Sequence, residues 1–167
     1  MTFASVDRKH LRALMTLQIG QQAPDFDATT HAGESISLSA LRGDKAVVLY
    51  FYPKDETPGC TAEACSFRDA YEDFTDAGAV VIGVSSDSPD SHEKFAANHR
   101  LPFKLISDES GDLRRSYDVP KAMLGMLPGR VTYVIDKQGK VQHVFNSMLK
   151  AKRHVAEALT VVKRLAG

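Results

Sequence analysis

The sequence predicts an α/β fold in which a mixed central sheet is flanked by helices. Two continuous apolar runs, Ala46–Tyr52 and Ala79–Val84, are typical of interior strands covered on both faces. A helical pattern lies between them, and an antiparallel hairpin and a closing helix follow toward the C-terminus. With 167 residues, of which 43% are hydrophobic, the chain is long enough for one domain, expected over residues 16–167.

The helix between the two strands is marked by apolar residues at positions i, i+3, i+4 and i+7, and Gly78 is expected to end it. These apolar residues are Phe67, Ala70, Tyr71 and Phe74. A second helix is predicted from Ser88 and Pro89 through about Asn98. Serine is a preferred N-cap, and proline is favoured at the first helical position.

The hairpin is predicted from two short strands, Val131–Ile135 and Lys140–Phe145, joined by a turn that ends in Gly139. The closing helix is amphipathic. Its expected buried residues are Val155, Ala158, Leu159 and Val162. This order of elements is that of a thioredoxin-like fold, and ligands bind such α/β sheets at the carboxyl ends of the strands.

Met1–Met15 is interpreted as an N-terminal extension, because it precedes the predicted domain and is rich in basic residues. It is an unstructured tail, a remnant of a targeting sequence, or a segment that is not translated because the true start codon encodes Met15.

Composition excludes several classes of function. Lys and Arg together number 21, as do Asp and Glu, so no net charge attracts nucleic acid or an anionic membrane. No apolar run approaches the length of a membrane span. Two cysteines are too few for a disulfide scaffold. Because no secretory-type apolar segment is recognised, the expected location is a reducing compartment, by default the cytoplasm. In that setting a cysteine pair indicates catalytic, redox or metal chemistry.

Cys60 is the first candidate for reactivity. The segment Pro53–Cys60 follows the first predicted strand, so Cys60 lies where the carboxyl end of that strand meets a helix N-terminus. Free backbone N–H groups and the helix dipole favour thiolate over thiol at this position. The alternative is a small buried cysteine that only fills space.

Cys65 lies five residues further along the same helix. At about 100° per residue, Cys60 shares the apolar face with Phe67, whereas Cys65 lies about 140° away on the polar face. Their Cα atoms are roughly 8–9 Å apart in an intact helix, and a disulfide tolerates only about 7 Å. If the two cysteines bond, the first turns must unwind. The alternative for Cys65 is an incidental surface residue.

The pattern Pro53-x-x-x-Thr57-x-x-Cys60 resembles the active-site motif of the peroxiredoxins. The longer string from Tyr52 to Asp69 is similar to the peroxiredoxin Q, or bacterioferritin comigratory protein, branch of that family. The similarity extends from about Gln18 to the last helix. It also covers two further segments, Gly83–Ser88 and Arg130–Asp136.

This resemblance implies a thiol-dependent peroxidase that reduces hydrogen peroxide and organic hydroperoxides. Cys60 would be the peroxidatic cysteine that becomes a sulfenic acid, and Cys65 the resolving cysteine of an intramolecular disulfide. Thioredoxin or a related dithiol donor would recycle the enzyme. No metal, haem, flavin or other cofactor is implied. A resolving cysteine in the same helix needs no partner subunit, so a monomer is expected.

The resemblance also assigns Arg130 as the guanidinium that holds thiolate and peroxide oxygens. The alternative is an exposed residue at a strand end. Because an exposed ion pair contributes only about 0–1 kcal/mol, loss of Arg130 is expected to change stability little. Glu63 either orients Arg130 or complements the helix dipole as a first-turn acid.

Three further residues complete the predicted site. The Thr57 hydroxyl can accept from one peroxide group and donate to another, or it can form a local turn. Pro53 would shield the pocket from water, a role compatible with ending the strand. The backbone N–H groups of Gly59 and Cys60 can stabilise charge on the leaving oxygen.

Other enzyme classes have less support. The six histidines form no motif with Cys60, so a Cys–His hydrolase is unsupported, and the cysteine spacing does not match a zinc site. A dithiol–disulfide oxidoreductase or a non-enzymatic redox-sensing module using the same cysteine pair stays open as the alternative.

Overall fold

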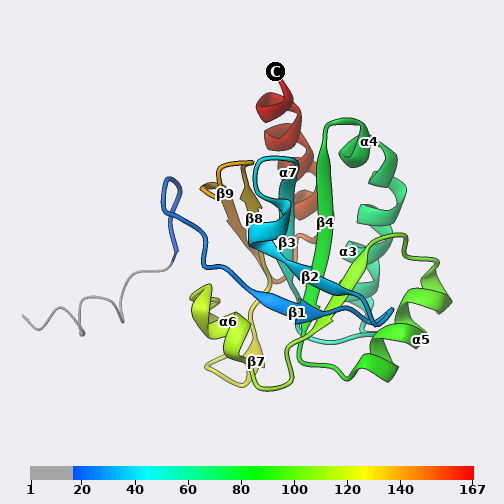
Figure 1. Cartoon of the computed structure of the whole chain (residues 1–167). Coiled ribbons are helices and arrows are strands. Elements are labelled where there is room, and N and C mark those ends of the chain that lie inside the picture. Colours follow the sequence, from blue (N-terminus) through cyan, green and yellow to red (C-terminus); the bar gives the residue numbers. More distant parts are fainter. Residues whose placement is uncertain (1–16) are drawn as a thin grey trace, which may run out of the picture.

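The structure, a computed structural model, describes residues 17–167, so the predicted extension Met1–Met15 lies outside the described residues. These residues fold around a five-stranded mixed sheet with the strand order β5-β4-β3-β8-β9 (Figure 1). Strands β3, β4 and β5 are parallel to one another, whereas β8 is antiparallel to β3 and β9 is antiparallel to β8. The sheet strands are β3 (Ala46–Phe51), β4 (Ala79–Ser85), β5 (Lys104–Ser107), β8 (Val131–Ile135) and β9 (Val141–Asn146).

Helices and a small hairpin cover the two faces of this sheet. One face carries α3 (Pro58–Asp69), α4 (Tyr71–Asp76), α5 (Pro89–His99) and α7 (Ala151–Ala166). The other face carries β1 (Asp27–Thr29), β2 (Ser35–Ser37), α2 (Leu38–Leu41) and α6 (Asp112–Ser116). The predicted mixed sheet with flanking helices, of thioredoxin-like type, is therefore confirmed.

Strand β3 divides the core into two apolar clusters, and every residue of it is buried. Its even-numbered residues pack under α3 and α7, and its odd-numbered residues pack toward β1 and α6. Successive strand side chains point to opposite faces, so a strand covered on both sides must be apolar throughout. The run that predicted this strand thus reflects its central place in the sheet.

The helix predicted between β3 and β4 is interrupted. Ala70 has φ −96° and ψ 4°, which separates α3 from α4 instead of continuing one helix to Gly78. This change of direction keeps both Phe67 and Phe74 fully buried, with ring centroids 5.7 Å apart. Packing against the sheet therefore overrides the local helical pattern.

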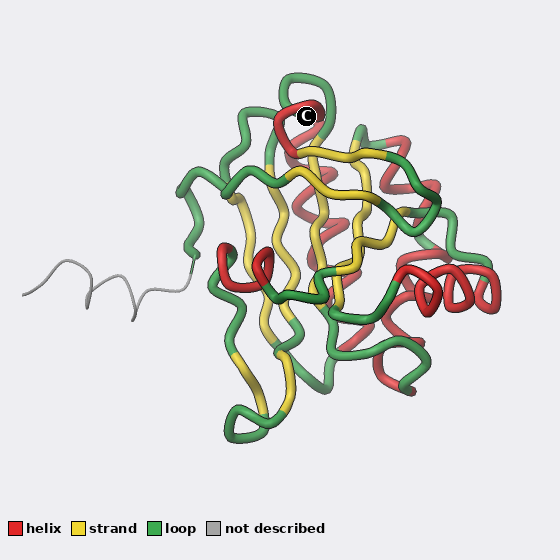
Figure 2. The backbone as a smooth tube through the Cα atoms, turned by 60° about the horizontal axis from the view of Figure 1, so that its bottom comes forward, coloured by secondary structure: helices red, strands yellow, loops and turns green. Residues whose placement is uncertain are grey.

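Several short elements were not predicted. Strand β5 extends the parallel part of the sheet, and β1 and β2 pair as a hairpin. A second hairpin, formed by β6 (Lys121–Ala122) and β7 (Leu127–Pro128), projects away from the sheet (Figure 2). Segments of two to four residues are too short to show a periodic pattern.

The closing helix α7 buries more than its apolar residues. Val155, Ala158 and Val162 are buried as predicted, but Leu159 is only partly buried. His154 is buried as well, with no exposed surface. Within residues 17–167, no helix combines the length and apolar character needed to cross a membrane.

Candidate active site

A short loop carries the chain from β3 to α3 and positions the candidate thiol. Thr57 is the N-cap of α3 and Pro58 its first residue, so Cys60 lies in the first turn. The Cys60 side chain is 1% exposed and packs in the core with Tyr50 and Tyr52. The thiol therefore lies at the carboxyl end of a central strand and beneath the helix N-terminus.

The loop is fixed by the buried carboxylate of Asp55. The Tyr52 hydroxyl donates to Asp55 Oδ1 at 2.6 Å, and His92 Nδ1 lies 2.7 Å from Oδ2. The Asp55 backbone N–H donates to Asp87 Oδ2 at 2.9 Å. Although Asp55, Asp87 and His92 bring ligand-type atoms within 4.8 Å of one another, these atoms already have hydrogen-bond partners in the protein. We interpret the cluster as an anchor for the loop.

Arg130 brings β8 into contact with the thiol. Its Nη2 donates to Cys60 Sγ at 3.3 Å, its Nη1 donates to Glu63 Oε1 at 3.0 Å, and its Nε donates to the Met148 carbonyl oxygen at 3.2 Å. Burial works against the cationic form, but interactions with the Glu63 carboxyl group and the Cys60 sulfur raise the pKa of Arg130 above its ordinary value. The guanidinium is therefore held in one orientation by three acceptors.

The alternative interpretation of Arg130 as an exposed residue at a strand end is wrong. Arg130 is only 3% exposed, because β8 pairs with the central strand β3 and the start of β8 lies under α3. An ion pair at this depth is not weakened by solvent as a surface pair is. The small effect of losing Arg130 on stability, expected for an exposed pair, therefore does not apply to this buried one.

Gly59 leaves space for this guanidinium. A Cβ atom at Gly59 would lie 3.0 Å from Arg130 Nη2. The first intrahelical bond of α3 runs from Thr61 N–H to the Thr57 carbonyl oxygen. The N–H groups of Gly59 and Cys60 precede it and have no partner of that type in the helix. They are available to an oxygen placed next to the sulfur.

Glu63 is fully buried one helical turn beyond Cys60. Its Oε1 accepts from Arg130, while its Oε2 has no hydrogen-bond partner, and His154 Nδ1 lies 3.6 Å away. Burial raises the pKa of Glu63 to about 8, although Arg130 acts in the opposite direction. A carboxyl group in this position holds its proton far more readily than an exposed glutamate does.

Three other predicted residues occupy less buried positions. The Thr57 hydroxyl donates to the Lys54 carbonyl oxygen at 2.8 Å, which leaves its lone pairs free to accept. Pro53 is half-buried at the end of β3. Cys65 is partly exposed, and both it and Cys60 are free thiols in one continuous helix.

Arg114 and His154 are site residues that the sequence did not reveal. Arg114 Nη2 donates to the Tyr52 carbonyl oxygen at 3.2 Å and Nη1 to that of Gly129 at 3.4 Å. It thereby ties the end of β3 to the residue before Arg130. Both Arg114 and His154 are far from Cys60 in sequence and belong to no recognisable motif. Only folding brings them to the site.

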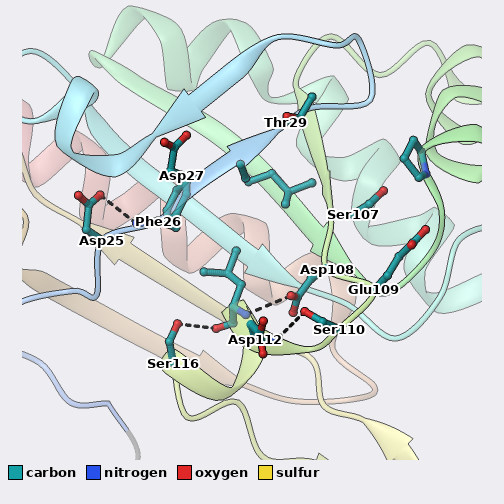
Figure 3. Close-up of a pocket in the computed structure, with 14 residues that line it drawn as sticks. Asp25, Phe26, Asp27, Thr29, Ser107, Asp108, Glu109, Ser110, Asp112 and Ser116 are labelled. Carbon is teal, nitrogen blue, oxygen red and sulfur yellow. Dashed lines mark hydrogen bonds between the residues drawn. The ribbon is translucent and has the colours of Figure 1, made fainter.

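A separate cavity of about 710 Å³ opens between β1, β5 and α6 (Figure 3). Its rim includes the acidic residues Asp25, Asp27, Glu109 and Asp112. The carboxylate of Asp108, which also lines the cavity, accepts from the backbone N–H groups of Leu113 and Arg114 and so holds the start of α6. None of the predicted site residues lines this cavity.

A buried thiol beneath a helix N-terminus, bonded to a guanidinium on a thioredoxin-like sheet, defines a class of enzymes that use thiolate chemistry. Comparison with known proteins identifies the class more closely. The family model described as the AhpC/TSA family matches residues 19–144. The chloroplastic peroxiredoxin Q of Populus jackii is 49% identical over 146 residues, which are 87% of this chain and 68% of that protein. The chloroplastic peroxiredoxin Q of Arabidopsis thaliana is 47% identical over 160 residues, 95% of this chain and 74% of that protein.

Solved structures agree with these relatives. The crystal structure of peroxidoxin BcpB from Mycobacterium tuberculosis has a TM-score of 0.82 and 36% identity, and the match covers 89% of this chain and 98% of that one. A cysteine-to-serine mutant of PrxQ from Xylella fastidiosa has a TM-score of 0.83 and 29% identity, with 92% and 99% covered. The chain belongs to the AhpC/TSA family, in its peroxiredoxin Q branch, and is a thiol-dependent peroxidase that acts on hydroperoxides.

Proposed function

We propose that Cys60 is the peroxidatic cysteine of this peroxidase. Its sulfur attacks the O–O bond of a hydroperoxide, which gives a sulfenic acid and releases an alcohol or water. The observation that carries this assignment is the hydrogen bond from Arg130 Nη2 to Cys60 Sγ, made at the N-terminus of α3. Both the guanidinium and the helix N-terminus stabilise the thiolate, which is the attacking form.

The residues around Cys60 support distinct steps. Arg130 has N–H groups on the side of the sulfur, where a peroxide oxygen would also bind. The N–H groups of Gly59 and Cys60 stabilise the charge that develops on the leaving oxygen. Thr57 accepts from the incoming peroxide, because its own proton is donated to Lys54. Pro53, half-buried beside the loop, limits the access of water.

We further propose that Cys65 resolves the sulfenic acid by forming an intramolecular disulfide with Cys60. This assignment is supported by the two free cysteines in α3. An intact helix keeps their Cα atoms roughly 8–9 Å apart, so the disulfide requires the N-terminal part of α3 to open. Thioredoxin or a related dithiol donor would then reduce the disulfide by thiol–disulfide exchange.

Both hydrogen peroxide and organic hydroperoxides are proposed as substrates. A relative from Xanthomonas campestris, 33% identical with a TM-score of 0.79, is described by its alkyl peroxide reduction activity. The family assignment favours this peroxidase over the dithiol oxidoreductase and the redox-sensing module considered from the sequence.

We propose a monomer in a reducing compartment. A resolving cysteine in the same helix makes the site complete within one chain. Several relatives are named as chloroplastic, so we propose an organellar location as the alternative to the cytoplasm. Light scattering of the purified chain tests whether it is a monomer, and fractionation of the source cells tests its location.

Peroxide consumption with thioredoxin and its reductase tests the assignment of the two cysteines. Cys60→Ser is expected to lose essentially all turnover. Cys65→Ser is expected to oxidise once per chain and then stop, because no resolving thiol remains. Substantial turnover by Cys60→Ser would contradict the proposal, as would a Cys65→Ser variant that turns over like the wild type with the same donor.

A further inference from the structure

Two acids share one buried cation in this site. Cys60 Sγ lies 3.3 Å from Arg130 Nη2, and Glu63 Oε1 lies 3.0 Å from Nη1 of the same guanidinium. All three side chains are at most 4% exposed. One positive charge can balance one negative charge, and a second uncompensated anion at this depth is costly.

Among residues 17–167, no other neighbour of Glu63 supplies a second positive charge. From α7, His154 faces Glu63 Oε2 at 3.6 Å. The His154 Nε2–H donates to the Ser147 carbonyl oxygen at 2.8 Å, and in a neutral ring Nδ1 then carries no proton and accepts from the Thr132 hydroxyl at 2.8 Å. Burial lowers the pKa of His154 to about 4, in agreement with a neutral ring.

A further side chain near the pair is Tyr50 of β3. Its hydroxyl is buried and has no hydrogen-bond partner, and burial raises its pKa well above the ordinary value. A neutral phenol adds no charge. Charge balance around the single Arg130 cation therefore favours one negative charge and one retained proton on Cys60 and Glu63 together.

We propose that Glu63 stores this proton while Cys60 is a thiolate, and releases it when Cys60 is oxidised to the sulfenic acid. The proposal rests on the assignment of Cys60 as the peroxidatic cysteine and adds the source of a proton to it. Because Arg130 lies between Glu63 and the sulfur, Glu63 is a positioning residue that acts through the charge of Arg130. The unpartnered Oε2 and the raised pKa of Glu63 agree with a protonated carboxyl group in the reduced enzyme.

The step balances in atoms and charge. A sulfur electron pair attacks the terminal peroxide oxygen, the S–O bond forms and the O–O bond breaks. Sulfur is oxidised, the peroxide is reduced, and the leaving alkoxide takes one proton to become an alcohol. The proton lost by Glu63 balances the proton gained by the alkoxide, whether it passes along the N–H groups of Arg130 or through solvent. Arg130 then pairs with the Glu63 carboxylate instead of the thiolate, so the site stays neutral before and after.

Proton uptake during a single oxidation tests the proposal. Cys65→Ser is the parent, because it stops at the sulfenic acid, and it is mixed with one equivalent of hydrogen peroxide in weakly buffered indicator solution near pH 7. Glu63→Gln in that parent keeps an oxygen acceptor for Arg130 but stores no proton. We expect Glu63→Gln to take up one more proton per oxidised thiol than the parent. Glu109→Gln, at an exposed glutamate that lines the separate cavity, is the matched control and should equal the parent.

Equal uptake by the parent and Glu63→Gln would overturn the inference. Mass spectrometry of the same samples separates this result from failure of the proposed function, since a parent whose Cys60 stays unoxidised contradicts the function itself. If Glu63→Gln does not fold, infrared spectroscopy of the parent decides. We expect the C=O band of a protonated carboxylic acid in the reduced protein to disappear on oxidation. Absence of that band in the reduced parent would overturn the inference.

Discussion

Arg130 Nη2 lies 3.3 Å from Cys60 Sγ, although 70 residues separate them in the chain. The contact exists because β8 pairs with β3, and a short loop joins β3 to α3. A buried guanidinium stabilises a thiolate more strongly than an exposed one, since the protein interior screens charge less than water does. The pairing of two sheet strands thus brings the charge of Arg130 to the sulfur of a helix residue.

Arg130→Met is expected to lower the thiolate fraction of Cys60 at pH 7 and to slow its oxidation by peroxide about 100-fold, as loss of one oxyanion donor does. It is also expected to destabilise the protein by about 1–3 kcal/mol, because the buried carboxyl group of Glu63 loses its hydrogen-bond donor. Iodoacetamide labelling, stopped-flow oxidation and urea unfolding measure the three effects. Arg130→Lys is the control, which keeps the charge but not the fork. Unchanged labelling and oxidation rates would show that Arg130 does not activate Cys60.

Gly59→Ala separates activity from stability. Alanine favours a helix over glycine by about 0.5–1 kcal/mol. This gain offsets part of the free energy lost when Arg130 is displaced, so the melting temperature should change little. The new Cβ lies 3.0 Å from Arg130 Nη2, so the guanidinium must move and oxidation of Cys60 should slow at least tenfold. Stopped-flow kinetics and thermal unfolding give the two readouts. Wild-type oxidation rates would show that the contact is easily relieved.

Oxidation is expected to open the N-terminal part of α3. The reduced protein has one helix from Pro58 to Asp69 with both sulfurs unbonded. After one equivalent of peroxide, amides near 59–66 should exchange faster, while those of α7 keep their protection. Mass spectrometry should find a Cys60–Cys65 disulfide within one chain. A bond formed only between chains, or a free Cys65 beside oxidised Cys60, would refute the intramolecular mechanism.

Slow opening of α3 is expected to leave Cys60 open to overoxidation. Until the helix opens, the sulfenic acid of Cys60 stays within reach of a second peroxide molecule, which would oxidise it to the sulfinic acid. Raising the peroxide concentration should therefore increase the sulfinic form of the wild type. In Cys65→Ser, where no disulfide can protect Cys60, the same form should accumulate at lower peroxide concentration.

Asp55→Ala is expected to destabilise the protein by about 3 kcal/mol, because it leaves Tyr52 and His92 without a buried acceptor. Oxidation of Cys60 should also slow, since the anchored loop leads into α3. Urea unfolding at pH 7 measures the first effect. Asp44→Ala, at an exposed position, is the matched control and should change stability by less than about 0.5 kcal/mol. Equal effects of the two substitutions would show that Asp55 is no anchor.

His154 is expected to make the free energy of unfolding depend on pH. Its pKa is lowered to about 4 in the folded state from an ordinary value of 6.5, because it is buried beside Arg130. Between these two values the unfolded chain binds the extra proton, so stability falls as pH decreases, by up to about 3 kcal/mol from this group alone. His154→Gln should flatten the difference between unfolding at pH 6.5 and pH 4.5. Parallel pH profiles for the two proteins would exclude this contribution.

Much of the site could be predicted from the sequence because its residues are local. Pro53, Thr57 and Cys60 fall within one strand-to-helix connection, and the strand and helix on either side have strong hydrophobic patterns. The central strands, the hairpin after Arg130 and the closing helix were predictable for the same reason. The peroxiredoxin resemblance also followed from contiguous residues, and the comparisons confirm it.

Only the tertiary structure decided how deeply these residues are buried and which charges they share. Arg130 reads as a strand-end residue in the sequence, yet the pairing of β8 with β3 places it under α3. Glu63 reads as a first-turn acid, yet it lies fully buried between Arg130 and His154. Burial depends on contacts between segments 67 and 91 residues apart, which no local pattern encodes. Burial also determines protonation, because a charge removed from water must find a partner or be neutralised.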